Sequence, residues 1–125
     1  RYLMGLGQPE EIVRAVQQGI DMFDCVLPTR NARHGTLYVR NKKSKIKDKK
    51  FYQIMHVTNE QYCTDFQSID PYCSCFTCTH HTRAYLRHLF KVGEPLALRL
   101  ATIHNVHFYL ELMERLSESI VAGTL

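Results

Sequence analysis

Three cysteines within six residues constrain this chain more than any other feature of its sequence. Cys73, Cys75 and Cys78 form a C-x-C-x-x-C run, and thiolates this close together can converge on one metal ion. They are too close together for a natural disulfide framework, and the sequence shows no secretory signal. Polar neighbours such as Ser74 and Thr77 argue against the alternative, three buried free thiols. We therefore predict metal ligation in a reducing cytosol.

A tetrahedral zinc ion would need a fourth ligand, and spacing alone does not choose it. His80 and His81 follow Cys78 too closely to turn back easily onto the same ion, whereas His104 lies 26 residues after Cys78. A turn at Gly93 would let the helix that carries His104 fold back against the cysteines. Four protein ligands would close the coordination shell, so we expect a structural role. The candidate histidines are His34, His56, His80, His81, His88, His104 and His107.

The first 28 residues predict a strand, a helix and a second strand with short connections. Residues 2–7 form the first strand and its glycine-containing turn, and residues 8–11 begin a helix with proline and acids in its first turn. Gly19 is the expected helix end, and the mostly buried strand 20–26 stops at Pro28. Two strands cannot form a parallel sheet alone. We therefore expect the rest of the sheet in a longer protein, of which this chain is a fragment.

The rest of the chain predicts a small irregular subdomain followed by helices. Residues 35–78 are polar and basic, with β-forming residues at 36–39. A helix is expected over 79–90, ended by Gly93, and a long helix from about 95 to 120. The sequence has no run of 18 consecutive apolar residues, so we expect no membrane span. The apolar residues that define the long helix are Leu96, Leu100, Ile103, Leu110, Met113 and Ile120.

A basic block lies between residues 40 and 50, with Asp48 as its one acid. Such a block is typical of a solvated loop, but it also suits a surface that binds phosphate groups. Its cations are Arg40, Lys42, Lys43, Lys45, Lys47, Lys49 and Lys50.

Asp24 lies at the end of the second predicted strand, the usual place for catalytic groups in parallel α/β folds. The alternative is a structural aspartate that caps a neighbouring loop. Asp21 is the rival carboxylate, but it has the opposite parity and would face another side of the strand. Cys25 suits a small core residue better than a nucleophile. Arg30 and Arg33 follow in a segment that fits an anionic or base-edge contact, although a plain loop is the alternative.

Five segments together resemble the tRNA-guanine transglycosylase family. They occur in the family's order and spacing and extend over nearly the whole chain. They are Arg1–Gly7, Asp21–Arg33, Cys73–Cys78, Thr82–Leu86 and Thr102–Asn105.

This resemblance implies an α/β fold, the C-terminal portion of a (β/α)8 TIM barrel with an inserted zinc-binding subdomain. Residues 1–34 would be the last barrel units, with the nucleophile and the tRNA-reading segment. Residues 35–92 would be the zinc-binding subdomain, and residues 93–125 the closing C-terminal helix. The stretch between Gly35 and Cys73 is longer than the family suggests, so residues 40–62 include an expected insertion.

The resemblance also assigns roles to individual residues. Asp24 matches the family nucleophile, Met4 and Gly5 match the base-binding positions, and His104 becomes the fourth ligand of one structural zinc ion. The full expected zinc set is Cys73, Cys75, Cys78 and His104. The expected RNA-binding residues are Gly5, Leu6, Gly7, Gln8, Pro9, Glu10, Glu11, Thr29, Arg30, Asn31, Ala32 and Arg33.

The family reaction, as the resemblance implies it, exchanges a tRNA base in queuosine biosynthesis. The wobble guanine of tRNAs with GUN anticodons, those for aspartate, asparagine, histidine and tyrosine, is replaced by a 7-deazaguanine base. That base is the aminomethyl-deazaguanine precursor or queuine, and the exchange proceeds through a covalent ribosyl-aspartate. The second carboxylate of the family is absent from this chain, so we expect the isolated fragment to be inactive. The alternative is a non-catalytic, zinc-stabilised tRNA-binding subunit or module.

A homodimer is the last expectation. His81, Tyr85 and His88 are spaced to share one helix face, and the resemblance implies that the matching helix lies at a homodimer interface. Ordinary packing onto the barrel is the alternative.

Overall fold

The computed structural model describes residues 1–41, 44–46, 48 and 50–125. Four cations of the basic block, Lys42, Lys43, Lys47 and Lys49, lie outside the described residues. The described chain is a mixed helix and strand structure. Its elements in order are β1 (Tyr2–Met4), α1 (Pro9–Gln17), β2 (Met22–Asp24), α2 (Leu27–Arg33), β3 (Thr36–Arg40), β4 (Tyr52–His56), a 3-10 turn (Glu60–Tyr62), α3 (Phe76–His80), α4 (Arg83–Lys91) and α5 (Pro95–Val121).

The strand–helix–strand unit at the start of the chain is confirmed. β1 and β2 pair in parallel, with Met4 opposite Asp24. α1 begins at Pro9, and the Glu11 carboxylate accepts a hydrogen bond from the Gln8 N–H at 3.0 Å. The prediction of a buried strand over residues 20–26 was wrong, because β2 has three residues and Met22 and Asp24 are exposed. Two paired strands leave one face of a parallel sheet uncovered.

Pro28 begins a helix instead of ending a strand before a loop. It lies in the first turn of α2, where its missing N–H costs nothing and its fixed φ suits the helix. Ala32 of α2 is completely buried, and α2 packs against α5. The alternative of a plain loop for residues 29–33 was therefore wrong.

Residues 35–78 are more regular than predicted. β3 and β4 form an antiparallel pair in which Thr36 lies opposite His56 and Arg40 opposite Tyr52. Leu37 and Tyr38 are fully buried. The basic block connects the two strands, and its charge hid the second strand from the sequence pattern.

The helix predicted over residues 79–90 is two helices, α3 and α4. The Cys75 sulfur caps α3 by accepting a hydrogen bond from the Cys78 N–H at 3.3 Å. The Thr82 hydroxyl caps α4 by accepting from the Tyr85 N–H at 3.1 Å. Each side chain satisfies a backbone donor that a helix start leaves free, so the chain starts a new helix at each point.

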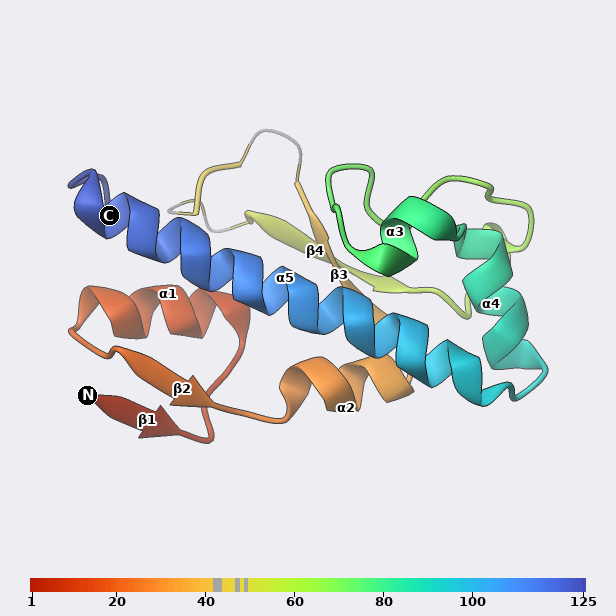
Figure 1. Ribbon diagram of the computed structural model, residues 1–125, viewed down its shortest axis with the longest axis horizontal. Helices are drawn as coiled ribbons and strands as arrows, with labels where there is room; N and C mark the ends of the chain where they lie inside the picture. Colours follow the sequence, from red (N-terminus) through yellow and green to blue (C-terminus); the bar gives the residue numbers. More distant parts are fainter. Residues whose placement is uncertain (42–43, 47, 49) are drawn as a thin grey trace.

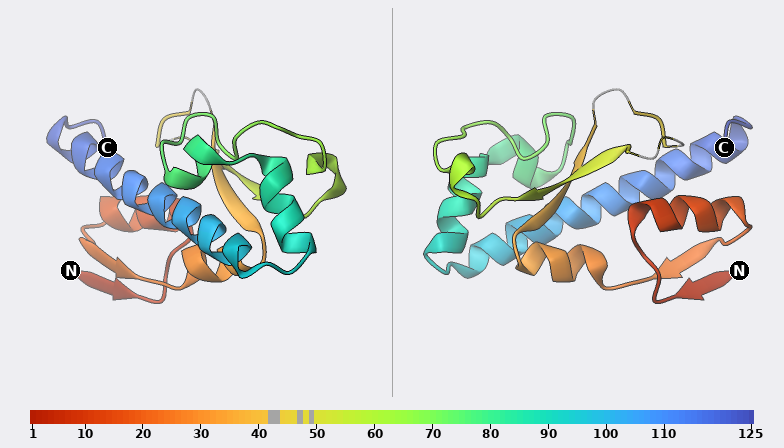
Figure 2. Two further views of the ribbon diagram at one scale, coloured as in Figure 1. Left: turned by 45° about the vertical axis from the view of Figure 1, so that its right-hand side comes forward. Right: turned by 180° about the vertical axis from the view of Figure 1, so that it is seen from behind.

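α5, with 27 residues, is a long helix that runs along most of the length of the molecule in Figure 1. Gly93 precedes it with a φ of 73°, which reverses the chain after α4 as predicted. Seen from behind in Figure 2, α1 and α2 both lie along α5, near its C-terminal and N-terminal halves respectively. Within the residues that the structure describes, no helix has the length and apolar character needed to cross a membrane.

The long helix predicted from about 95 to 120 is confirmed as α5. The six apolar residues that define its period do not mark its buried face, because only Leu100 is buried, while Leu110 and Ile120 are 60% and 57% exposed. The buried face includes two polar residues and two alanines, which a hydrophobic pattern does not select. It consists of Ala97, Leu100, Ala101, His104, Asn105, Phe108, Tyr109, Leu112 and Leu116.

Candidate metal centre and candidate active site

The cysteine run and His104 come together as predicted. The three sulfurs and one ring nitrogen of Cys73, Cys75, Cys78 and His104 all lie within 4.8 Å of one another, and all four residues are buried. The His104 Nδ1 atom is 3.2 Å from the Cys78 sulfur and 3.6 Å from the Cys75 sulfur. Tetrahedral zinc with its usual bond lengths separates such donor atoms by about 3.6–3.8 Å. The group can therefore hold a metal ion.

A contact with the backbone of β3 orients the His104 ring so that Nδ1 faces the sulfurs. His104 Nε2 lies 2.6 Å from the Tyr38 carbonyl oxygen, which can only accept a hydrogen bond. Nε2 must then carry a proton, which leaves Nδ1, the nitrogen beside the sulfurs, as the atom that can bind a metal ion. Outer hydrogen bonds of this kind orient metal-binding histidines and raise their basicity.

A buried aspartate holds the loop that leads into the cysteines. Asp70 is 1% exposed, and its carboxylate accepts hydrogen bonds from the N–H groups of Arg40 and Tyr72 at 3.0 and 2.9 Å. Its carbonyl accepts from the Cys73 N–H at 3.1 Å. Arg40 also forms an ion pair with Glu111 of α5. The metal loop is thus attached to both β3 and α5.

Asp24 lies on the uncovered face of the β1–β2 pair. Its register partner Met4 is beside it, and Tyr2 and Met22 share the same face by strand parity. The Tyr2 hydroxyl donates a hydrogen bond to the Asp24 carboxylate at 3.0 Å. This bond, together with a partial loss of hydration and the charge of Asp24, raises the pKa of Tyr2 above its usual value. Tyr2 therefore stays protonated at neutral pH and remains a donor to Asp24.

A cavity of about 490 Å³ opens beside Asp24. Met4, Gly5, Gln8 and Arg30 contribute to its walls, so most of the cavity is formed by the segments predicted to bind base and RNA. Gly5 has a φ of 84°, and its N–H donates to the Asp24 carbonyl at 2.8 Å. The turn after β1 is thus attached to the end of β2.

Cys25 follows β2, packs against Gly7 in the turn and also lines the cavity beside Asp24. A Cβ added to Gly7 would lie 2.0 Å from the Cys25 sulfur, so only glycine allows this close approach. Cys25 is half-buried. Of the two roles considered for Cys25, small core residue and nucleophile, this placement fits the core residue.

The residues predicted to contact RNA lie in two segments at this cavity. Some of their side chains are exposed and others point into the protein. Arg30 and Arg33 are exposed on α2. The Asn31 side chain points inward and donates to the Tyr38 hydroxyl at 2.6 Å, and Ala32 is buried, so neither presents its side chain to a ligand here. In the other segment, Glu10 accepts a hydrogen bond from the Tyr52 hydroxyl at 2.6 Å.

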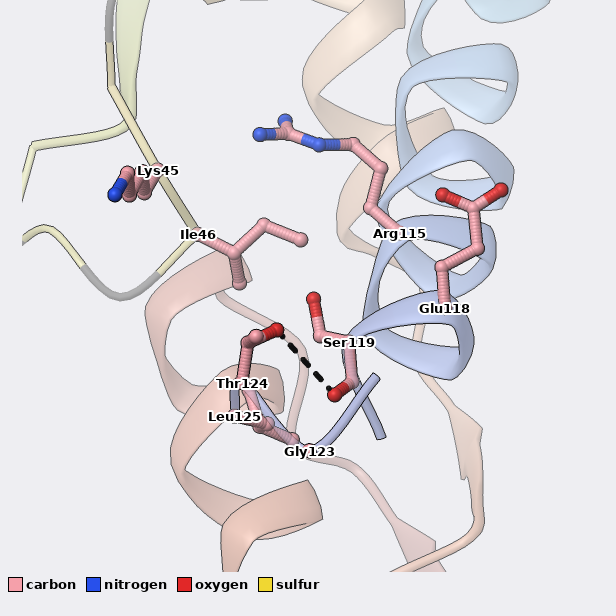
Figure 3. Close-up of a pocket in the computed structure, with 8 residues that line it drawn as sticks. All are labelled: Lys45, Ile46, Arg115, Glu118, Ser119, Gly123, Thr124 and Leu125. Carbon is pink, nitrogen blue, oxygen red and sulfur yellow. Dashed lines mark hydrogen bonds between the residues drawn. The ribbon is translucent and has the colours of Figure 1, made fainter. Parts of the chain in front are cut away.

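A larger cavity, of about 590 Å³, lies between the basic block and the C-terminal part of α5. Figure 3 shows Lys45, Arg115 and Glu118 around it. Its charges are of mixed sign, and its lining includes neither Asp24 nor the metal ligands. Of these two cavities, only the smaller one is lined by Asp24, the predicted nucleophile. Arg40 of the basic block forms an ion pair with Glu111 and donates a hydrogen bond to the Tyr72 carbonyl. Its guanidinium therefore stabilises the loop before the cysteines and does not form a free basic surface.

The three residues of the expected dimer face do not all lie on one helix. Tyr85 and His88 are exposed on α4, whereas His81 precedes that helix. The His81 ring nevertheless stacks on the Tyr85 ring with centroids 5.1 Å apart. Phe76, 52% exposed, stacks on His80 at 4.3 Å and extends this aromatic surface.

Sequence reasoning missed the roles of three residues at these sites: Tyr2, Tyr38 and Asn105. Tyr2 could have been found from strand parity, because in a parallel pair with this register it shares a face with Asp24. Tyr38 and Asn105 contact residues far along the chain, and no local pattern marks them.

A buried group of three cysteines and one histidine that can hold a metal ion, together with a parallel strand–helix–strand unit that has a carboxylate at its open end, defines a mixed helix and strand protein with a candidate metal centre. The sequence model of the queuine tRNA-ribosyltransferase family matches residues 1–125. The chain therefore belongs to this family.

Individual relatives agree with this assignment. The queuine tRNA-ribosyltransferase of Histophilus somni is 52% identical over 120 residues, which are 96% of this chain and 29% of that protein. The protein of the same name from Moorella thermoacetica is 49% identical over 125 residues, which are 100% of this chain and 31% of the relative. The one from Nitrosomonas eutropha is 51% identical over 123 residues, which are 98% of this chain and 31% of the relative. The chain spans less than a third of the length of these relatives.

Proposed function

We propose that this chain is the C-terminal part of a tRNA-guanine transglycosylase, which exchanges the wobble guanine of a tRNA for a 7-deazaguanine base. The observation that carries the proposal is the placement of Asp24 beside Met4 on an open strand face, with Gly5 and Arg30 around the same cavity. In this proposal the remaining strands of a (β/α)8 barrel complete the cavity. The chain contributes the last barrel units, residues 1–34, the metal subdomain, 35–92, and the closing helix, 93–125.

The proposed reaction has two displacement steps at one ribose carbon. The Asp24 carboxylate attacks the anomeric carbon of the wobble nucleotide, the bond to guanine breaks, and guanine leaves after taking up a proton. A ring nitrogen of the incoming 7-deazaguanine then attacks the same carbon, expels the carboxylate and loses its proton. The target base must leave the stack of the anticodon loop to reach the cavity.

The residues around Asp24 have complementary roles in this proposal. Tyr2 orients the carboxylate through its hydrogen bond, which leaves the second carboxylate oxygen for the ribose. Met4 is 70% exposed and presents an apolar surface against which a flat base can pack. Arg30 and Arg33 offer planar cationic groups for phosphates or base edges.

The metal proposed for the Cys73, Cys75, Cys78 and His104 centre is one zinc ion. Thiolate and imidazole donors in a tetrahedral arrangement suit zinc. With four protein ligands the ion would have no free position for water, so it would stabilise the fold and take no part in the bond changes. We propose a reducing compartment, the cytoplasm, because cysteines that serve as metal ligands must not be oxidised to disulfides.

The experiment that tests the function uses the full-length protein that contains this chain. We expect it to incorporate labelled guanine into a tRNA transcript with a GUN anticodon, and to incorporate none when the wobble guanosine is replaced by adenosine. Unlabelled aminomethyl-deazaguanine or queuine should compete with the labelled guanine and identify the natural base. Tight tRNA binding without exchange would instead favour the non-catalytic tRNA-binding subunit.

Removal of either exposed arginine of α2 is expected to weaken recognition of the RNA. Arg30→Ala or Arg33→Ala in the full-length protein should cost about 1–3 kcal/mol of binding free energy if the contact is bidentate to a base. The measurement is the Kd for the tRNA transcript at constant salt concentration. Lys91→Ala, which removes one exposed charge from the end of α4, is the control. An equal loss of affinity in all three variants would show that the arginines contribute only general electrostatic attraction to the RNA.

We also propose that the surface around Tyr85 and His88 joins two copies of the full-length protein. Exposed stacked rings are typical of contact surfaces. The double change Tyr85→Ala and His88→Ala should shift the protein from dimer to monomer at low micromolar concentration, as measured by sedimentation velocity. Ile54→Ala, on the β3–β4 hairpin and 44% exposed, is the matched control. If the double variant stays dimeric, the rings pack within one chain and do not form the dimer interface.

A further inference from the structure

The backbone edge of β3 that faces α5 is covered by two side chains of that helix. The Tyr38 N–H donates to Asn105 Oδ1 at 3.2 Å, and the Tyr38 carbonyl accepts from His104 Nε2 at 2.6 Å. The Thr36 carbonyl accepts from Asn105 Nδ2 at 3.0 Å. In an antiparallel pair, alternate residues direct their backbone groups away from the partner strand. His104 and Asn105 therefore take the place of a third strand.

The Asn105 side chain also reaches a third element. Its Nδ2 group makes a second hydrogen bond, 3.1 Å long, to the Pro28 carbonyl in the first turn of α2. Asn105 is completely buried, and its amide oxygen and both of its N–H donors are used. One side chain next to a metal ligand thus joins α5, β3 and α2.

A second hydrogen bond fixes α2 nearer its other end. Asn31 Nδ2 donates to the Tyr38 hydroxyl at 2.6 Å. The Tyr38 ring is itself held between Phe108 and Tyr109 of α5, with centroids 5.4 and 5.3 Å away. The two hydrogen bonds that hold α2 therefore connect it, through Asn105 and through Tyr38, to the part of α5 that contains His104.

We infer that Asn105 is a positioning residue that sets α2, and with it Arg30 and Arg33, relative to Asp24; this rests on the function proposed above. α2 has seven residues and begins three residues after Asp24. A helix this short has little stability of its own, so tertiary contacts decide its orientation. Asn105 provides such a contact from the rigid helix that also holds the metal ligand.

A change at Asn105 should affect RNA recognition and leave metal binding intact. Loss of the two Asn105 donors leaves the four metal ligands in place but releases the start of α2. The effect should therefore appear in RNA recognition and in the local opening of residues 27–34, and not in metal content. The rate of the bond changes at Asp24 should vary little, because Tyr2 and Gly5 hold Asp24 through separate hydrogen bonds.

The test compares three variants of the zinc-loaded full-length protein. Asn105→Asp keeps an acceptor for the Tyr38 N–H but removes the donors to Pro28 and Thr36. Tyr38→Phe keeps the ring and removes only the hydroxyl that anchors Asn31. Leu89→Ala is the control, because Leu89 is a buried α4 residue in the core around the cysteines, and its loss destabilises the fold without touching these hydrogen bonds.

For Asn105→Asp we expect one zinc per chain, amide hydrogen exchange over residues 27–34 about tenfold faster, and a KM for tRNA about tenfold higher. Its kcat should change less than about threefold. Tyr38→Phe should change exchange and KM in the same direction, by a smaller factor. Leu89→Ala should lower the melting temperature and leave the exchange of residues 27–34 unchanged.

Equal exchange over residues 27–34 in the Asn105→Asp variant and the parent would overturn the inference, as would equal acceleration in the Leu89→Ala control. If Asn105→Asp does not fold, unchanged exchange in Tyr38→Phe has the same consequence. A parent protein that exchanges no guanine would defeat the proposed function alone, because hydrogen exchange requires no activity and still decides the role of Asn105.

Discussion

The Asp24→Asn variant of the full-length protein is expected to lose guanine exchange completely while it still binds tRNA. Asparagine keeps the shape of the side chain and can still accept the hydrogen bond from Tyr2, but its amide cannot form the ribosyl ester. The measurements are incorporation of labelled guanine into the tRNA and detection of an enzyme–tRNA adduct that survives denaturing electrophoresis. Both signals should disappear, and the Kd for tRNA should stay within about threefold of the parent value.

Asp21→Asn is the matched control for this change. Asp21 lies just before β2, is also exposed, and has the opposite parity to Asp24. We expect this variant to retain exchange and the adduct. If the Asp24→Asn enzyme still formed the adduct and the Asp21→Asn enzyme did not, Asp21 would be the nucleophile.

Loss of one metal ligand is expected to unfold the region between residues 70 and 105. Structural zinc contributes about 10–16 kcal/mol of apparent binding free energy in zinc-finger peptides, which is comparable to the about 5–15 kcal/mol that stabilises a typical protein. The Cys75→Ser variant should bind less than one zinc per chain by elemental analysis. Amide exchange over residues 70–105 should become fast, and α2 should open as well through Tyr38 and Asn105.

Cys63→Ser is the control, because Cys63 is an exposed thiol outside the metal centre. This variant should keep the zinc content and the melting temperature of the parent. A strong chelator should reproduce the effect of Cys75→Ser on the parent protein and on Cys63→Ser alike. A Cys75→Ser variant with the melting temperature of the parent would contradict a structural zinc site.

Several local features could be predicted because their causes are local. Pro9 and the acids after it mark the start of α1, and Gly93 marks the turn before α5. The cysteine spacing predicted the metal centre, since three thiols within six residues cannot lie far apart. The choice of His104 came from the family resemblance, because seven histidines were compatible with the spacing.

Other features depend on contacts between distant segments, and the sequence pattern failed there. The helix expected over residues 79–90 divides because Thr82 caps a second helix, and the basic block concealed the pairing of β3 with β4. Of the six apolar residues that predicted α5, only Leu100 is buried. Its buried side contains His104 and Asn105, whose polar atoms are satisfied by a strand more than 60 residues away in the chain.

The sequence by itself determined the three clustered cysteines, the resemblance to the family and the parity that separates Asp24 from Asp21, because spacing, motifs and strand periodicity are properties of the chain alone. Only the tertiary structure decided that α2 is a helix held by Asn105, that Tyr2 donates to Asp24, and that Ala32 and Asn31 face inward. The physical reason is that a buried polar group must find a partner. The position of that partner depends on how α5, β3 and α2 pack together.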